Sequence, residues 1–218
     1  MPLDPPTRPD ADVREATTDD LPVIADTLAD AFADYRWTRW VLPADDYERR
    51  LRAVQLYYAE RVGLPHGRVW VARDGAAVAV WTLPDVALPE ELFTAAELVE
   101  LHGDRGAVMA RAEELLAPHR PQEPCWFLAT VGVRRADQGS GLGRAVLAPG
   151  IAAAEASGHP AFLETADEGN VGFYRSLGFE VTAEVALPGD APRVWCMLRR
   201  PRADKVAGSL EERSRGVF

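Results

Sequence analysis

The sequence contains few cysteines and few histidines. Its two cysteines, Cys125 and Cys196, lack the paired spacing of a metal site, and they are too few for a disulfide framework. We therefore expect both to be buried, reduced thiols, as free cysteines usually are. The four histidines lie far apart in the sequence, so we predict no metal site.

Long apolar runs and an export signal are also missing. No run approaches the roughly 18 to 20 apolar residues that a membrane-spanning helix needs. The first residues are rich in proline and acid, without the basic start and apolar stretch of a secretory signal. We therefore expect a cytoplasmic protein without a membrane partner.

Basic residues are fewer than acidic ones, so the formal net charge is -10. This argues against a nucleic-acid partner, since phosphate binding usually needs a basic face. The same charge favours a cationic small molecule as the partner.

The chain is long enough for one domain with a substantial core. Its 218 residues are 47% hydrophobic, an ordinary value for a globular protein. We expect a disordered lead at 1–12, one domain at 13–200 and a flexible tail at 201–218. The sequence shows no internal repeat, and both a monomer and a homodimer are compatible with it.

Hydrophobic periodicity predicts alternating helices and strands in the first half. A short strand at 13–16 precedes a helix from Leu21 to about Tyr35, and Tyr35–Val41 is expected to be a loop. The other elements expected there are a helix at 45–62, hairpin strands at 68–72 and 77–81, and helices at 89–101 and 104–116.

The second half begins with an almost continuous apolar run, Trp126–Val133, which suits a central strand covered on both faces. The elements expected after it are a helix at 142–156, a strand at 161–165, a helix at 171–177, and strands at 181–185 and 194–198. This order predicts an α/β protein with one mixed sheet and helices on both faces.

A glycine-rich loop, Gln138–Gly143, joins the central strand to the next helix. Glycines let backbone N–H groups converge on one point, and the helix start adds free N–H groups and the positive end of its dipole. The loop lacks both the dinucleotide fingerprint and the Gly-Lys-Ser/Thr of a nucleoside-triphosphate loop. It predicts a phosphate site of another kind, with a flexible turn as the alternative.

Two motifs resemble those of the GCN5-related N-acetyltransferase (GNAT) superfamily. Val133-x4-Gln138-x2-Gly141-x-Gly143 is similar to its pyrophosphate motif, and Asn170–Phe179 is similar to its later motif. The resemblance implies the GNAT fold, a mixed and mostly antiparallel twisted sheet that splays apart at the cofactor site. It also implies acetyl-CoA as the cofactor and N-acetylation of a small-molecule amine.

A narrower resemblance, to the puromycin N-acetyltransferases, covers most of residues 13–200. The stretches that carry it are Ala31–Tyr35, Val69–Ala72, Asp74–Trp81, Leu116–Pro121, Trp126–Val133, Phe162–Thr165 and Trp195–Met197. It implies an aminonucleoside antibiotic such as puromycin as the acceptor, and a role in antibiotic resistance. Arg36, Trp37 and Trp40 are bulkier and more basic than the corresponding stretch of that family.

The resemblance also assigns the cofactor contacts. The backbone of Val131, Gly132 and Val133 would pair with the pantetheine arm like an added strand. Asn170 would contact the same arm, or else cap its own helix. The pyrophosphate would be held by the loop and the first helical turn, namely Gln138, Gly139, Ser140, Gly141, Leu142, Gly143 and Arg144. Arg134 and Arg135 beside the loop are either further phosphate contacts or solvated surface.

Tyr174 corresponds to the tyrosine that protonates the departing thiolate in the superfamily. A phenol suits this task because its ordinary pKa of about 10 keeps it protonated at neutral pH. The alternative is a tyrosine that only packs. The base that takes the amine proton is open between Glu164, Tyr35 and a water relay, and Glu164 is alternatively a structural carboxylate.

The acceptor pocket is expected to have aromatic walls, which suit a nucleoside or another flat ring. Its predicted members are Tyr35, Trp37, Trp40, Trp81, Trp126 and Phe127. Trp70 and Trp195 are interpreted instead as core residues.

No cysteine occupies a motif position, which favours direct transfer in a ternary complex over a covalent acyl-enzyme. In that reaction a backbone N–H of the central strand would polarise the thioester carbonyl. Two alternatives stay open. One is a GNAT enzyme for another amine, such as an amino sugar, an amino acid or a protein lysine. The other is a non-catalytic acyl-CoA-binding domain.

Overall fold

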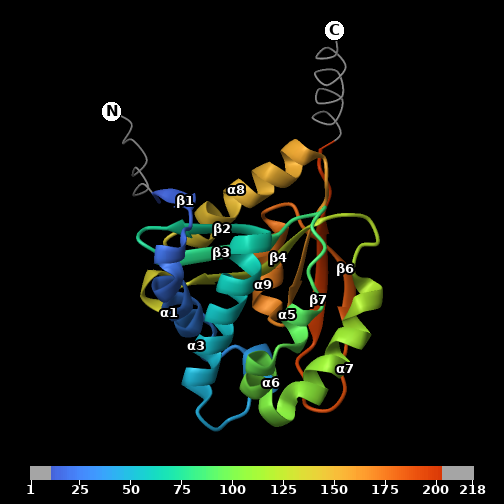
Figure 1. Cartoon of the computed structure of the whole chain (residues 1–218). Helices are drawn as coiled ribbons and strands as arrows, with labels where there is room; N and C mark the ends of the chain where they lie inside the picture. Colours follow the sequence, from blue (N-terminus) through green and yellow to red (C-terminus); the bar gives the residue numbers. More distant parts are fainter. Residues whose placement is uncertain (1–10, 203–218) are drawn as a thin grey trace, which may run out of the picture.

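The structure, a computed structural model, describes residues 11–202 (Figure 1). The predicted disordered lead at 1–12 and flexible tail at 201–218 fall almost entirely outside these residues. The strands are β1 (Val13–Glu15), β2 (Gly67–Ala72), β3 (Ala77–Thr82), β4 (Trp126–Val133), β5 (Ala161–Thr165), β6 (Glu180–Val185) and β7 (Val194–Arg199).

The α-helices are α1 (Leu21–Phe32), α2 (Arg36–Val41), α3 (Tyr47–Tyr57), α4 (Leu64–His66), α5 (Glu91–Thr94), α6 (Ala96–His102), α7 (Gly106–Leu116), α8 (Leu142–Ser157) and α9 (Glu168–Arg175). A π-helix, η2 (Tyr58–Gly63), continues α3, and short 3-10 turns are η1 (Thr18–Asp20), η3 (Gly103–Arg105), η4 (Ala117–His119) and η5 (Arg135–Asp137).

The described strands form one sheet in the order β1-β2-β3-β4-β5-β7-β6. Every neighbouring pair is antiparallel except β4 and β5, which are parallel. Helix α8 covers one face of this sheet, and α1 and α3 cover the other (Figure 1). The predicted mixed, mostly antiparallel sheet with helices on both faces is confirmed.

The parallel pair separates part-way along its length. Strand β4 pairs with β5 only from Trp126 to Leu128, although β4 continues to Val133. The register between β3 and β4 shifts at Ala129, which is left without a partner as a β-bulge. Within residues 11–202, the rest of β4 therefore pairs with β3 alone, and its edge toward β5 is open.

Alternating side chains fill a separate core on each face, which is why β2, β3 and β4 are largely apolar. The core beneath α8 takes Trp70, Ala72, Ala77, Ala79, Trp81 and Leu128 from these strands. The core beneath α1 takes Val69, Val71, Val78 and Val80 from the same hairpin. The predicted hairpin strands are confirmed, with Gly75 in the left-handed conformation of the turn at φ +82°.

Helix α8 approaches the sheet closely at Gly150. A Cβ atom built on Gly150 would overlap the indole ring of Trp81, whose side chain is fully buried. Trp81 also meets Trp126 edge to face, with ring centroids 6.5 Å apart. The absence of a side chain at Gly150 thus fixes the position of α8 on the sheet.

The prediction of a loop at Tyr35–Val41 is wrong. This segment is mostly helical, because Oγ1 of Thr38 lies 2.9 Å from the carbonyl oxygens of Phe32 and Tyr35, and Tyr47 Oη donates to it. The helix expected at 45–62 is present as α3 and η2, and η2 rests on the sheet through Gly63.

We expect Gly150→Ala to lower the free energy of unfolding by about 1–3 kcal/mol, because the new methyl group overpacks the Trp81 contact. Urea denaturation measures the change. Gly106→Ala in α7 is the matched control, since its Cβ meets no atom within 4 Å and alanine favours a helix. An equal effect of the two substitutions would contradict the packing argument.

Candidate functional site

The glycine loop lies between the open end of β4 and the start of α8. Gly139 and Gly141 adopt left-handed conformations, with φ +75° and +90°, and a Cβ on either would meet no atom within 4 Å. Helix α8 begins directly after Gly141, without a side-chain cap and without an acid in its first turn. Free N–H groups and the positive end of a helix dipole suit an anion, so the start of α8 is a candidate anion site.

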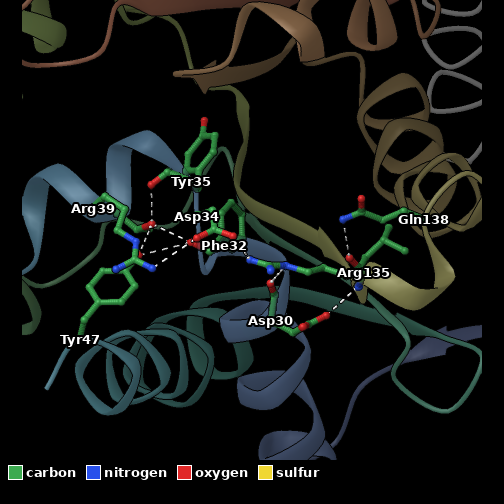
Figure 2. A network of polar contacts seen from close by, with 10 residues as sticks. Asp30, Phe32, Asp34, Tyr35, Arg39, Tyr47, Arg135 and Gln138 are labelled. Carbon is green, nitrogen blue, oxygen red and sulfur yellow. Dashed lines mark hydrogen bonds and ion pairs between the residues drawn. The ribbon is translucent and has the colours of Figure 1, made fainter.

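Arg135 points away from this anion site and fastens the loop to α1 (Figure 2). Its Nε donates to the carbonyl of Asp30 at 2.9 Å, and its backbone N–H donates to the Asp30 carboxylate at 2.7 Å. Its guanidinium also pairs with Asp34 at 2.7 Å. Arg135 therefore holds the loop in place rather than contacting a phosphate.

The same network continues into α2 (Figure 2). Asp34 also pairs with Arg39 at 3.3 Å, and the guanidinium of Arg39 lies 3.8 Å above the ring of Tyr47. On the loop side, the amide of Gln138 donates to the carbonyl of Val133 at 3.2 Å. The corner between α1 and α2 is thus connected to the glycine loop by side chains.

Tyr35 reaches across this corner to the end of β5. Its Oη accepts a hydrogen bond from the backbone N–H of Ala166 at 2.7 Å and lies 3.3 Å from Oγ1 of Thr165. Burial raises the pKa of Tyr35, and the nearby Asp167 adds to this effect. A phenolate is therefore unfavourable here, which makes Tyr35 a poor general base.

Tyr174 is buried on α9, between Phe173 and Phe179. Burial raises its pKa above the ordinary value for tyrosine, and the nearby phenol of Tyr35 raises it further. Tyr174 belongs to the core beneath α8, whereas Tyr35 packs with the cluster on the opposite face. The two phenols thus belong to clusters on opposite faces of the sheet.

Asn170 lies inside α9 rather than at its start. The N-cap is Asp167, whose carboxylate accepts from Gly169 N at 2.9 Å. The alternative role of Asn170 as the helix cap is therefore wrong. Its half-buried side chain makes no hydrogen bond within the described part of the chain, so it is available to a ligand.

Glu164 is held by an ion pair and is not a free carboxylate. Arg120 donates to both of its oxygens, at 2.7 and 3.0 Å, and also bonds to Glu113 at 2.7 Å. The sequence analysis missed Arg120 and Glu113. Only the placement of α7 over the sheet brings them to β5, so no local pattern could have indicated them.

The predicted acceptor aromatics divide between the two faces of the sheet. Tyr35, Trp37, Trp40 and Phe127 border one cluster, on the face away from α8. There the ring centroids of Trp37 and Trp40 lie 5.5 Å apart. The ring of Phe127 stacks on that of Phe162, with a centroid distance of 5.9 Å.

Trp81 and Trp126 belong to the core beneath α8, so their predicted place in the acceptor pocket is wrong. Trp81 is fully buried beneath α8, so a substrate cannot reach its ring. Trp126 is also buried, and its Nε1 donates to Oγ of Ser157 at 3.0 Å. Strand alternation is the physical reason, because Trp126 points to the face opposite to Phe127.

Both cysteines are free thiols, but only Cys196 is buried as predicted, since Cys125 is partly exposed. Burial raises the pKa of Cys196 to about 12, and the neighbouring Glu164 adds to the shift.

In residues 11–202, no three metal-binding side chains gather in one place. Over the same range, no helix has the length and apolar character needed to cross a membrane.

The profile of the acetyltransferase (GNAT) family matches residues 29–179. This span exceeds half of the chain and contains β4, the glycine loop and Tyr174. The chain belongs to the acetyltransferase (GNAT) family. The predicted superfamily is therefore confirmed.

Solved structures agree with this assignment. A structure named histone acetyltransferase HPA2 and related acetyltransferase, from Corynebacterium glutamicum, is 28% identical, with TM-score 0.70, and the match covers 88% of this chain and 97% of that one. An arylalkylamine N-acetyltransferase-like protein from a mosquito is 17% identical, with TM-score 0.56 and coverage of 86% and 98%. The ribosomal-protein-S18-alanine N-acetyltransferase of Escherichia coli is 19% identical, with TM-score 0.52 and coverage of 88% and 94%. The last two show the fold alone.

We expect Asp30→Ala to loosen the glycine loop. The substitution removes the acceptor of the Arg135 N–H, a bond worth about 1 kcal/mol, so amide hydrogen exchange across 134–141 should rise on the order of fivefold. Asp26→Ala is the control, because Asp26 also lies on α1 but pairs with Arg52 of α3. Unchanged exchange in Asp30→Ala would show that the tether does not order the loop.

Proposed function

We propose that this acetyltransferase uses acetyl-CoA to acetylate the amine of a small molecule. The observation that carries the proposal is the open edge of β4, beyond Leu128, which leads directly into an uncapped anion site at α8. Peptide groups at a strand edge suit the two amides of a pantetheine arm, and converging N–H groups suit a pyrophosphate.

Residues of this chain would hold the cofactor largely through the backbone. Val131 and Val133 offer peptide groups at the open edge of β4 to the pantetheine arm. Gly132 acts through its backbone only, since a Cβ there would lie 2.9 Å from the side chain of Leu28. The loop from Gln138 to Arg144 receives the pyrophosphate, and Asn170 contacts the arm. When bound, acetyl-CoA supplies an activated acetyl thioester and leaves as a thiol.

Tyr174 is proposed as the general acid. Its Oη gives the proton that the sulfur takes up when the carbon–sulfur bond breaks. Burial raises the pKa of Tyr174, so the phenol carries the proton to be donated at neutral pH.

The proton of the acceptor amine is proposed to leave through water. Glu164 is neutralised by Arg120, so we assign it a structural role. The raised pKa of Tyr35 and its bond from Ala166 N make it a wall of the acceptor site rather than a base.

Direct transfer is proposed, so that the nitrogen–carbon bond forms as the carbon–sulfur bond breaks. A covalent route through a thiol is disfavoured by the chemistry of the cysteines. Burial raises the pKa of both Cys125 and Cys196, which keeps them as weakly nucleophilic thiols.

An amine with a flat aromatic part is proposed as the acceptor, and an aminonucleoside such as puromycin is the first compound to test. The cluster around Tyr35, Trp37, Trp40 and Phe127 supports this choice. A protein lysine is the second candidate, because the Corynebacterium structure is named after a histone acetyltransferase.

A thiol-release assay with acetyl-CoA tests the function. The acceptor panel contains puromycin, an amino sugar, an amino acid and a lysine-containing peptide, and mass spectrometry identifies the acetylated nitrogen. Turnover of puromycin supports the full proposal, whereas turnover of another member alone moves the acceptor to that class. If no acceptor of the panel caused thiol release although coenzyme A bound, a non-catalytic binding domain would be favoured.

Tyr174→Phe should lower kcat by about 10²- to 10⁴-fold, the usual contribution of a general acid. The dissociation constant of coenzyme A should stay within about twofold, because the substitution removes only a hydroxyl group. Tyr57→Phe is the control, since its hydroxyl bonds to Leu92 O, away from the site. If kcat were unchanged in Tyr174→Phe, Tyr174 would not be the general acid.

The pH profile gives an independent test of the same residue. A raised pKa means that Tyr174 loses its proton only above about pH 10, the ordinary value for tyrosine. The measured kcat should therefore show no alkaline decline below about pH 10. A descending limb near pH 8 or 9 that disappears in Tyr174→Phe would contradict the shift.

A further inference from the structure

The turn that follows α9 is bonded to the backbone of Tyr174. The carbonyl of Tyr174 accepts from Leu177 N at 2.9 Å and from Phe179 N at 3.1 Å. Between these two residues, Gly178 has φ +89°, a left-handed conformation that glycine adopts without strain. Phe179 is buried and meets the ring of Tyr174 edge to face, with ring centroids 6.1 Å apart. A shift of this turn would therefore move the end of α9 that carries Tyr174.

Arg199, the last residue of β7, reaches this turn from outside the helix. Its Nε donates to the carbonyl of Leu177 at 3.0 Å. Its Nη2 forms an ion pair with Glu155 of α8, and the two side chains are only 11% and 9% exposed. A Cβ on Gly178 would lie 3.2 Å from Arg199 Nε, so the absence of a side chain there admits the guanidinium. Arg199 thus joins the end of α9 to β7 and to α8.

The ion pair with Glu155 gives this link a fixed direction. The second carboxylate oxygen of Glu155 accepts from the backbone N–H of Arg202 at 3.1 Å, which holds the carboxylate in place. A buried charge that loses its partner is strongly unfavourable, so the guanidinium of Arg199 cannot easily turn away from Glu155. Its Nε therefore stays directed at the carbonyl of Leu177.

We propose that Arg199 is a positioning residue for acetyl transfer, which holds Tyr174 Oη at the leaving sulfur through the turn at Leu177. The proposal rests on the proposed function, in which Tyr174 is the general acid. Arg199 acts on the proton transfer through the backbone of this turn rather than by touching the cofactor or the acceptor. A displacement of about 1 Å at the reacting atoms lowers a rate by about 100-fold, so a small shift of the turn is sufficient to slow the reaction.

The other end of α9 is held separately. Asp167 caps it by accepting from Gly169 N at 2.9 Å, and Asn170 lies in the first turn next to this cap. A substitution at Arg199 leaves these contacts in place. We therefore expect it to lower the rate of proton transfer while cofactor binding is largely retained.

A double-mutant cycle of Arg199→Lys and Tyr174→Phe tests the proposal, with acetyl-CoA and the panel acceptor that shows the highest turnover. Lysine keeps a positive charge for Glu155 but lacks the second donor that bonds to Leu177. Arg199→Lys should lower kcat about 10- to 100-fold and leave the KM for acetyl-CoA within about twofold. In the Tyr174→Phe background it should change kcat by less than about twofold, because no acid is left to be misplaced.

Arg200→Lys is the matched control. Arg200 is the next residue in the chain, but it pairs with Glu123 at the surface, at 3.0 Å. This substitution should leave kcat and KM unchanged in both backgrounds, whereas a loss of kcat equal to that of Arg199→Lys would contradict a specific role of Arg199.

A role of Arg199 in stability alone predicts a different result. Arg199→Lys would then lower kcat by the same factor in both backgrounds, and this result, or an unchanged kcat in the wild-type background, would overturn the proposal. If Tyr174→Phe alone left kcat unchanged, the proposed acid would be wrong, and the positioning role would fall with it. If thermal denaturation showed that Arg199→Lys is unfolded at the assay temperature, Glu155→Gln would take its place in the cycle and should give the same non-additive pattern.

Discussion

The separation of β4 from β5 after three paired residues is the constraint on which the rest of the site depends. A parallel pair requires a crossover helix, so α8 starts at the carboxyl end of β4, and α9 starts at the carboxyl end of β5. Both helix starts therefore lie at the same edge of the sheet. The bulge at Ala129 turns the rest of β4 away from β5 at this edge. The open edge of β4, the uncapped start of α8 and the helix that carries Tyr174 consequently lie at the same edge of the sheet.

Close packing holds these parts in register. Gly150 lets α8 lie on Trp81, and Gly132 lets α1 approach β4, with Leu28 and Ala31 next to the missing side chain. These glycines act through packing rather than through backbone freedom, unlike Gly139 and Gly141. Because α1 and α8 both contact β4, a shift of either helix would move the open strand edge.

Polar contacts connect the glycine loop, α1 and the end of β5. Arg135 ties the glycine loop to α1, and Tyr35 ties the corner after α1 to the end of β5. The corner after α1 and the glycine loop are thus anchored to the same helix.

Sequence reasoning was most successful where a local pattern is sufficient. The apolar run of β4, the glycine loop, the start of α8 and the motif around Tyr174 follow from periodicity, glycine chemistry and resemblance, and the family is confirmed. The sequence by itself determined the strands, the main helices and the glycine loop, because each depends on neighbouring residues.

Only the tertiary structure decided how the aromatic and charged residues are distributed. It placed Trp81 and Trp126 in the core beneath α8, and it paired Glu164 with Arg120. It also directed Arg135 toward α1. The physical reason is that the face to which a side chain points, and its long-range partner, depend on helix packing and strand register, which neighbouring residues do not specify.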